Sequence, residues 1–391
     1  MTALTYATAL LTTLLGLSSA LCWIVPLVDV QITGWKLRWL DQMEPLESQE
    51  YPAVTIIVPA LNEADTVEKA MQSLLTLDYP RFSILAVDDR STDETGAILD
   101  RIASEKDHLQ VVHVKSLPEG WLGKNHALHM GADSSKGDYL LFTDADVHMS
   151  SSTLLRSIGV MERENLDHLV ILPDVDVRGF WETLSVWFFG VILTMGYKPW
   201  RVPDPKSKAY MGVGAFNLVR RTAYEKSGGH SVLPMDVADD MKLGKILKRS
   251  GARCNVMMAG GCVSVRWVVG LRGIVVGLTK NMFGGMDYNP VKAIAGILGI
   301  FLLAVWPAIG LFVGPTAGRI FCMIAIFNMV YAAFRAAPKR GANPLYGLGF
   351  PIAGLIVIYI ILRSMWFTYR QGGIIWRGTL YPLDELRKGV V

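Results

Sequence analysis

The sequence has few charged residues and few cysteines. Charged residues make up 19% of the 391 residues, whereas about 25% is usual in a soluble domain, and hydrophobic residues make up 51%. The 38 basic and 35 acidic residues leave a net charge of only +3, which argues against a general nucleic-acid binder with its strong basic excess. The four cysteines show no metal-type spacing, so we expect reduced structural thiols and no disulfide framework.

Basic residues are also absent before Lys36. A cleaved signal peptide needs a basic start and a small-residue cleavage site, so the uncharged run from Ala7 to Leu27 indicates a retained membrane anchor within residues 1–35. Such a run is long enough to cross a hydrocarbon core of about 30 Å as a helix. Lys36 and Arg38 follow it, and the positive-inside rule therefore predicts that the chain continues in the cytosol.

Three further apolar stretches lie near the C-terminus, at 293–313, 320–334 and 345–367. They predict a transmembrane region over residues 291–367, followed by a tail over 368–391. The basic residues of one loop and of the tail both favour the cytosol; they are Arg335, Lys339 and Arg340, and Arg370, Arg377, Arg387 and Lys388. Three full spans cannot satisfy both groups, so either one stretch is re-entrant or the rule fails for the tail.

The middle of the chain, residues 52–262, has the pattern of a soluble domain. Short apolar or β-branched runs at 54–58, 83–87, 109–114 and 138–143 predict strands, and apolar residues at helical spacing lie between them. This alternation indicates an α/β fold with a mainly parallel sheet covered by helices. Ligands of such sheets bind at the carboxyl ends of the strands.

Polar clusters follow three of these predicted strands. They are Pro59, Asn62 and Glu63, then Asp88 and Asp89, then Asp144 and Asp146. Each cluster alone fits a turn or a helix cap, but three at successive strand ends of one sheet favour a binding site. Two carboxylates separated by one residue offer hard oxygen ligands, so Asp144 and Asp146 are candidate ligands for Mg²⁺ or Mn²⁺ beside a diphosphate.

Four motifs in this order resemble glycosyltransferase family 2, whose members have the GT-A fold. They are VTIIVPALNE from Val54, AVDDRSTDET from Ala86, GKNHAL from Gly123 and LLFTDAD from Leu140. The resemblance covers about residues 52–290 and implies a nucleotide-sugar donor, a UDP-sugar foremost, and inversion at the anomeric carbon. It assigns donor contacts to Pro59, Asn62, Glu63, Asp88, Asp89, Lys124, Asp144 and Arg266, and the metal to Asp146 together with Asp144.

A base is needed to take the acceptor proton in an inverting displacement. Asp239 and Asp240 precede a helical pattern and resemble the acidic motif that opens a helix in the family. The resemblance implies that Asp240 is the catalytic base and that Asp239 supports it. The alternative is a pair of helix-start acids that the helix dipole stabilises.

Two later segments carry weaker signals for the acceptor. Gly214 lies in a glycine-containing segment that resembles the family's acceptor side, although a strand and turn would also explain its glycines. Val263 to Trp267 resembles the Q/R-x-x-R-W motif of processive members, but Val263 replaces its first residue, which argues against polymerisation. The resemblance implies that Arg266 stabilises the diphosphate and that Trp267 stacks on the acceptor. His230 is either a turn residue or an acceptor contact.

Two segments are candidates for the membrane surface. Residues 263–290 predict an interfacial amphipathic segment, because basic residues interrupt an apolar helical pattern. The aromatic-rich run from Phe180 to Gly190 is a second candidate, with a buried core helix as the alternative.

The segments 120–125 and 375–381 resemble a subgroup associated with hopanoid and carotenoid glycosylation, with ceramide glucosyltransferases as more distant relatives. We therefore predict a metal-dependent enzyme of the bacterial inner membrane that glycosylates a hopanoid, carotenoid or other membrane lipid at the cytosolic face. A processive polysaccharide synthase and a non-catalytic membrane scaffold are the alternatives. A transporter is disfavoured, because no charged residue lies in the middle of a confident span.

Overall fold

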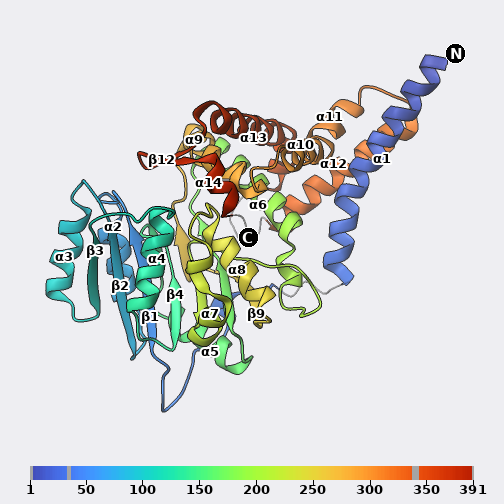
Figure 1. Cartoon of the computed structure of the whole chain (residues 1–391). Coiled ribbons are helices and arrows are strands. Elements are labelled where there is room, and N and C mark those ends of the chain that lie inside the picture. The colour runs from blue at the N-terminus through green and yellow to red at the C-terminus, as the bar shows by residue number, and fades with distance from the viewer. Residues whose placement is uncertain (1–2, 33–36, 337–342, 390–391) are drawn as a thin grey trace. The chain divides into compact units, whose positions relative to one another are not determined.

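The computed structural model describes residues 3–32, 37–336 and 343–389 (Figure 1). The chain forms two compact units. The sheet unit comprises Lys36–Asp176, Tyr197–Trp267 and Asp384–Val391, and the helical unit comprises Met1–Trp35, Val177–Gly196 and Val268–Leu383. Of the charges used above for topology, Lys36, Lys339 and Arg340 lie outside the described residues, and so does the side chain of Arg335.

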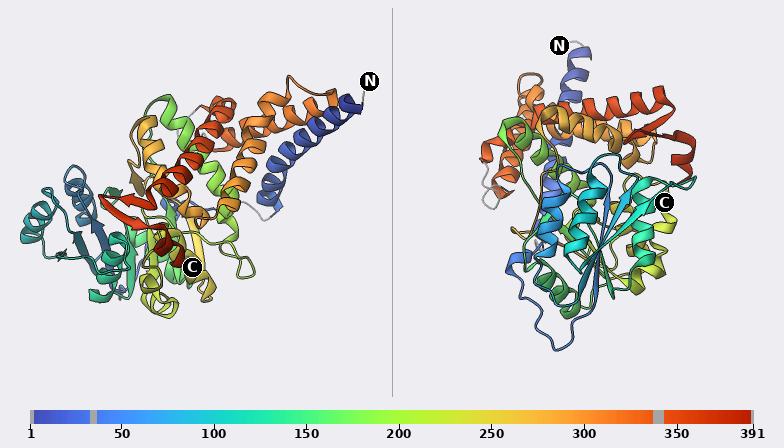
Figure 2. Two further views of the ribbon diagram at one scale, coloured as in Figure 1. Left: turned by 45° about the horizontal axis from the view of Figure 1, so that its top comes forward. Right: turned by 90° about the vertical axis from the view of Figure 1, so that its left-hand side faces the viewer.

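Seven strands form the main sheet of the sheet unit, in the order β3-β2-β1-β4-β8-β6-β9 (Figure 2). The strands are β1 (Val54–Ala60), β2 (Phe82–Asp89), β3 (Leu109–Val114), β4 (Tyr139–Phe142), β6 (His168–Leu172), β8 (Asn217–Arg220) and β9 (Cys254–Met258). All run in the same direction except β8, which is antiparallel to β4 and β6. The predicted α/β fold with a mainly parallel sheet is confirmed.

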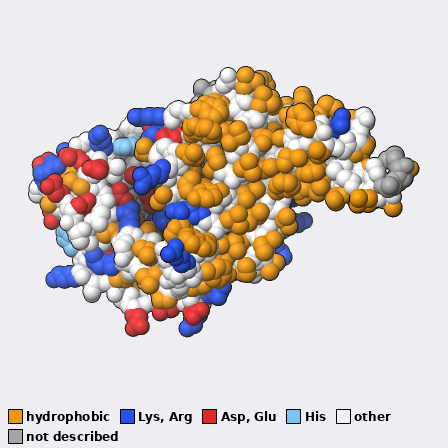
Figure 3. Space-filling model, turned by 90° about the horizontal axis from the view of Figure 1, so that it is seen from above, with side chains coloured by type: hydrophobic (Ala, Val, Ile, Leu, Met, Phe, Trp, Pro, Cys, Tyr) orange, Lys and Arg blue, Asp and Glu red, His pale blue; other side chains and the backbone are white. Residues whose placement is uncertain are grey.

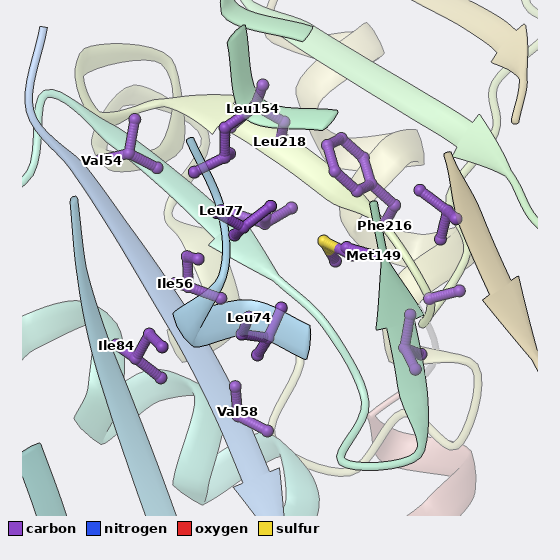
Figure 4. Packing of buried hydrophobic residues seen from close by; sticks show 14 of the residues in the cluster. Val54, Ile56, Val58, Leu74, Leu77, Ile84, Met149, Leu154, Phe216 and Leu218 are labelled. Atoms are coloured by element: carbon purple, nitrogen blue, oxygen red, sulfur yellow. The ribbon is translucent and has the colours of Figure 1, made fainter. Parts of the chain in front are cut away.

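Helices cover both faces of this sheet, because successive side chains of a strand point to opposite faces. Ile56 and Val58 of β1 lie in one hydrophobic cluster with Leu74 (Figure 4), whereas Ile57 between them lies in another cluster with Leu128. The first face packs against α2 (Val67–Leu75), α3 (Thr95–Glu105) and α5 (Thr153–Arg163), and the second against α4 (Gly123–Ser134), α7 (Arg221–Ser227) and α8 (Asp239–Arg249). Burial on both faces explains why the central strands are continuous apolar runs.

A second, three-stranded sheet connects distant parts of the sheet unit. It has the order β5-β10-β7, with β5 (Val147–Met149), β7 (Asp174–Val175) and β10 (Val263–Val265). Strands β5 and β10 are antiparallel and Val147 is paired with Val265. Asp146 directly precedes β5 and Arg266 directly follows β10, so the two residues lie at the same end of this antiparallel pair. The segment 263–290 thus begins inside a sheet, and its helix α9 (Gly270–Met282) belongs to the helical unit.

The helical unit presents an apolar surface (Figure 3). Among the described residues, five helices are long and apolar enough to cross a membrane, judged by length and composition: Ala3–Ile32, Gly179–Arg201, Pro290–Gly310, Thr316–Phe334 and Pro344–Gln371. Four of them contain or overlap the predicted apolar stretches. The fifth contains α6 (Gly179–Tyr197), which includes the aromatic run expected at the surface or in a core. Leu10, Phe327 and Leu355 are 62%, 70% and 53% exposed, as lipid-facing side chains would be.

The first helix, α1 (Ala3–Ile32), packs closely within the helical unit. Trp23 is fully buried, and its indole N–H donates a hydrogen bond of 2.8 Å to the carbonyl of Leu303. Leu303 lies in a π-helical turn (Phe301–Val305) between α10 (Pro290–Ile300) and α11 (Trp306–Gly310). A Cβ atom on Gly16 would lie 2.7 Å from the backbone oxygen of Gly318 in α12 (Thr316–Ala336), so only glycine allows this approach.

The tail has regular structure. After α13 (Phe350–Gln371), strands β11 (Gly373–Trp376) and β12 (Thr379–Pro382) form an antiparallel hairpin in the helical unit. The chain then enters α14 (Leu383–Lys388), and residues from Asp384 onward belong to the sheet unit. Gly389 lies against Met235 there. The chain therefore passes from the helical unit to the sheet unit directly after the hairpin.

Candidate active site

The loops that follow β1 and β2 are tied together by hydrogen bonds. Asn62 has a left-handed backbone (φ 54°), which asparagine tolerates better than most residues. Its N–H donates to Ser91 Oγ (3.1 Å), and its Oδ1 accepts from the N–H of Thr92 (2.8 Å). The N–H of Glu63 donates to Thr95 Oγ1 (2.8 Å). The structure thus brings the first two predicted clusters into one rim at the carboxyl edge of the sheet, and Pro59 lies just before this rim in β1.

Both carboxylates at the end of β2 have basic side chains as partners. Asp88 is 7% exposed and its Oδ2 lies 2.8 Å from His113 Nδ1. Asp89 is 2% exposed and forms a bidentate pair with Arg90, at 2.8 and 3.0 Å. A Cβ on Gly123 would overlap the Asp89 carboxylate, so the glycine before Lys124 is required by close approach. Sequence reasoning gave no role to His113, which belongs to no recognised motif, or to Arg90, which lies inside the AVDDRSTDET motif.

His113 makes stability depend on pH. Hydrogen bonds to Asp88 and Asp100 raise the pKa of His113 above its ordinary value of 6.5. A raised histidine pKa adds stability that is fully present below pH 6.5 and is lost as pH rises through the folded-state value. We expect His113→Gln to lower the melting temperature at pH 6 and to have progressively less effect at higher pH. Melting curves of both proteins from pH 5.5 to 9 test this, and a pH-independent difference would contradict it.

Lys124 joins the third cluster to α8. Its Nζ lies 2.8 Å from Asp144 Oδ1 and 3.5 Å from Asp239 Oδ1. A lysine in the first turn of α4 is opposed by the helix dipole, and the two carboxylates offset this cost. Burial alone would lower the pKa of Lys124, but Asp144, Asp239 and Asp240 raise it above its ordinary value. The side chain is therefore a partly buried ammonium group held by carboxylates.

Gly214 lies between Asp144 and Asp240. Its N–H donates to Asp240 Oδ2 (2.8 Å), and its carbonyl accepts from the N–H of Asp144 (2.9 Å). A Cβ atom at this position would overlap the Asp144 carboxylate, so close approach explains this glycine. Asp240 Oδ1 also accepts from the N–H of Met241 (2.7 Å). Burial is the main cause that raises the pKa of Asp240, and it does the same for Asp239.

These groups enclose one small cavity of about 10 Å³, enough for about one water molecule. Its lining includes Lys124, Asp144, Gly214, Asp239, Asp240 and His230. His230 is 1% exposed, and its Nδ1 lies 3.0 Å from the hydroxyl of Tyr224. Burial lowers the pKa of His230 to about 3, so it is neutral at physiological pH. The residue is thus a buried, neutral part of the site.

Asp146 lies apart from this cavity, at the start of β5. Burial, followed by the charges of Asp144 and Glu63, raises the pKa of Asp146 to about 6. Arg266, at the same end of the β5–β10 pair, donates to the carbonyl of Asp176 (2.7 Å). Trp267 is 37% exposed and ends the sheet-unit segment. The pairing of β5 with β10 therefore places Asp146 beside Arg266 and Trp267, although more than 100 residues separate them in the sequence.

Residues 55–228 match the family model described as Glycosyl transferase family 2. This range, a little under half of the chain, is a glycosyltransferase domain by its similarity to that model. The matched range contains the three polar clusters, Lys124 and Gly214, whereas Asp239 and Asp240 follow it. The enzyme class predicted from the sequence is confirmed, and the individual residue roles stay predictions.

Two similar proteins extend over most of the glycosyltransferase chain. The 4,4'-diaponeurosporenoate glycosyltransferase of Staphylococcus aureus (strain USA300) is 22% identical over 344 residues, which cover 86% of this chain and 90% of that protein. The mannosyltransferase PcManGT from Pyrobaculum calidifontis, solved with GDP-Man and Mn²⁺, aligns with a TM-score of 0.55 at 18% identity. It covers 91% of this chain and 99% of the other. The structural likeness confirms the GT-A type of fold.

Proposed function

We propose that this glycosyltransferase moves a sugar from a nucleotide-sugar donor, a UDP-sugar foremost, to a membrane lipid, with inversion at the anomeric carbon. The convergence of Lys124, Asp144, Asp239 and Asp240 on one cavity carries the proposal. This cavity lies where GT-A ligands are expected, at the carboxyl edge of the sheet. The apolar helical unit and the carotenoid-derived substrate named for the S. aureus relative support a hopanoid, carotenoid or similar acceptor.

In the proposed reaction, an acceptor oxygen forms a bond to the anomeric carbon while the bond from that carbon to the diphosphate breaks. Asp240 takes the proton of a hydroxyl acceptor, because two backbone N–H groups hold its carboxylate at the cavity. Asp239 and Lys124 maintain the charge balance around it. The nucleotide lies along the rim formed by Pro59, Asn62, Glu63, Asp88 and Asp89. Arg266 neutralises diphosphate charge, and Trp267 stacks on the acceptor near Gly214.

The residues present fit a divalent cation. Among the described residues no group of three or more His, Cys, Asp or Glu side chains could hold a metal alone. Mg²⁺ and Mn²⁺ sites beside nucleotides, however, use one or two carboxylates together with phosphate oxygens and water. Burial and the charges of Asp144 and Glu63 raise the pKa of Asp146, and a cation at this place would favour the charged carboxylate. Asp144 and Asp146 would hold Mg²⁺ or Mn²⁺, which when bound neutralises the negative charge of the departing diphosphate.

The test is donor turnover in a defined membrane. The full-length protein in lipid nanodiscs is incubated with UDP-, GDP- or dTDP-sugars and Mn²⁺, with and without a bacterial lipid extract, and released nucleoside diphosphate is measured. We expect release from one donor, stimulated by the extract and abolished by EDTA. Folded protein that releases nothing from any donor would contradict the proposal.

Chain topology supports placing the sheet unit on one side of the membrane. β4 precedes α6 and β8 follows it, yet the two strands are paired in one sheet. A helix between two such strands must return to the side that it left, so α6 lies in the interface rather than crossing. Because α14 also belongs to the sheet unit, the number of crossings between residues 268 and 383 must be even. One of the three C-terminal candidates is therefore re-entrant or interfacial, with the sheet unit and tail both in the cytosol.

This topology predicts a labelling pattern. We replace the four native cysteines with serine or alanine and introduce Leu4→Cys, Lys106→Cys or Arg387→Cys, one at a time. In intact cells, a membrane-impermeant maleimide is expected to label position 4 only. In inverted vesicles it is expected to label positions 106 and 387. Labelling of position 387 from the opposite side to position 106 would contradict the even number of crossings.

A further inference from the structure

The helical unit contains a cavity of about 270 Å³, separate from the small cavity of the sheet unit. It lies among the middle and end of α9, the last turns of α13 and strand β11. The proposed reaction uses none of its lining residues. A space of this size is large enough to take the head group of a lipid together with the start of its chain.

Two cationic side chains line this cavity, and none of the described residues that line it is acidic. Arg363 Nε donates to Thr279 Oγ1 (3.2 Å), and the guanidinium group lies 4.3 Å from the centroid of the Phe367 ring. The ammonium group of Lys280 lies 4.1 Å from the centroid of the Trp376 ring. The aromatic rings and the hydroxyl group hold both cations in place, so the cavity is electropositive before any ligand binds.

The cavity is located where lipid head groups lie. Pro344–Gln371 is apolar enough to span a membrane, and the lining residues of α13 are in its last turns. Trp366 and Tyr369 on the same turns are 53% and 47% exposed, as is typical of aromatic residues at the membrane–water boundary. Val276 and Ile375 line the cavity and are 54% and 52% exposed, which provides an apolar exit toward the bilayer.

We propose that this cavity binds the anionic head group of a membrane phospholipid, with its acyl chains leaving past Val276 and Ile375. Two cations in a lining whose described residues include no acidic side chain favour a negative head group over a zwitterionic one. The polar lining residues, among them Thr279 and Gln371, supply hydrogen bonds to phosphate oxygens. Lipid binding here fixes α9 against α13 and stands apart from the transfer reaction proposed above.

The test is native mass spectrometry of the full-length protein released from detergent micelles, without donor or acceptor. The protein is titrated with phosphatidylglycerol or with phosphatidylcholine of the same acyl chains. We expect the wild type to retain one phosphatidylglycerol more tightly than phosphatidylcholine. Removing one charge with Arg363→Gln or Lys280→Gln is expected to weaken that retention roughly fivefold, and removing both roughly 25-fold.

Three controls keep the result specific. Arg363→Lys keeps the charge and should retain the lipid, and Arg319→Gln removes an exposed cation of the helical unit that does not line the cavity. Inorganic phosphate in excess should not displace the lipid, because it lacks the chains. Equal retention of both lipids, equal retention by Arg363→Gln and wild type, or displacement by phosphate would each overturn the assignment. Melting temperatures confirm that the variants are folded.

Discussion

Asp240→Asn is expected to lower kcat on a hydroxyl acceptor by about 10² to 10⁴-fold, while the dissociation constant of the donor changes little. The amide keeps the size of the carboxylate but cannot take the acceptor proton. The backbone N–H groups of Gly214 and Met241 each donate to one oxygen of the Asp240 carboxylate. In the variant, the asparagine NH₂ group replaces one of these oxygens, so one backbone N–H loses its acceptor, which costs about 1–3 kcal/mol of stability. Initial rates in nanodiscs and donor binding by calorimetry separate the two effects.

Asp133→Asn is the matched control, because Asp133 lies on the same unit with a side chain that is 68% exposed. Its activity should equal that of the wild type. Full activity of Asp240→Asn on a hydroxyl acceptor would show that the assignment of the base is wrong. A carboxylate acceptor is already ionised at neutral pH, so the same variant should lose far less activity on it. Comparing both acceptors therefore tests the role of the side chain as well as its importance.

Asp146→Ala is expected to remove the contribution of the metal to catalysis. The activation barrier should rise by several kcal/mol, which lowers the rate by about 10² to 10⁴-fold. The measurement is Mn²⁺ titration of the donor complex by calorimetry, together with the rate of diphosphate release. We expect weaker Mn²⁺ binding and no restoration of the rate by excess Mn²⁺. Unchanged Mn²⁺ affinity would place the metal elsewhere.

Thermal unfolding distinguishes this loss from misfolding. The raised pKa of Asp146 means that its charged form opposes folding above about pH 6. Removing the carboxylate should therefore leave the melting temperature at pH 7.5 unchanged or higher in the absence of metal. Asp107→Ala, at an exposed position before β3, is the control for general effects of removing a carboxylate. A lower melting temperature for Asp146→Ala alone would contradict the burial argument.

The first half of the sheet could be predicted because its signals are local. The runs at 54–58, 83–87, 109–114 and 138–143 each correspond to a strand, β1 to β4, within a few residues. Their apolar continuity reflects burial on both faces, and the polar residues after them mark the carboxyl edge. The convergence of Asp144 with Asp239 was implied only by resemblance to a family, since about 95 residues separate them.

Other parts depend on pairing that no local pattern shows. Strands β5, β7 and β10 have only two or three residues each, too few for a period to be read. The glycine-containing segment allowed a strand and turn as an alternative, but no local pattern shows that its strand, β8, lies antiparallel in the middle of the sheet. His113 and Arg90 become site residues because of what they contact: a carboxylate at the end of β2. The hairpin and the helix α14 in the tail were likewise not predicted, because strands of four residues show too little periodicity.

The contact between Trp23 and Leu303 has a consequence for how the protein is made. The ribosome synthesises α1 well before the π-helical turn that accepts its indole hydrogen bond, because Leu303 follows Trp23 by 280 residues. Until then α1 lies in the bilayer as a single helix. Its Trp23 N–H has not yet reached the Leu303 carbonyl, and Gly16 has not yet packed against Gly318. A shortened protein that starts after α1 would leave the Leu303 carbonyl and a surface of α12 uncovered. Expression trials should therefore keep the first helix and place any purification tag at the other end.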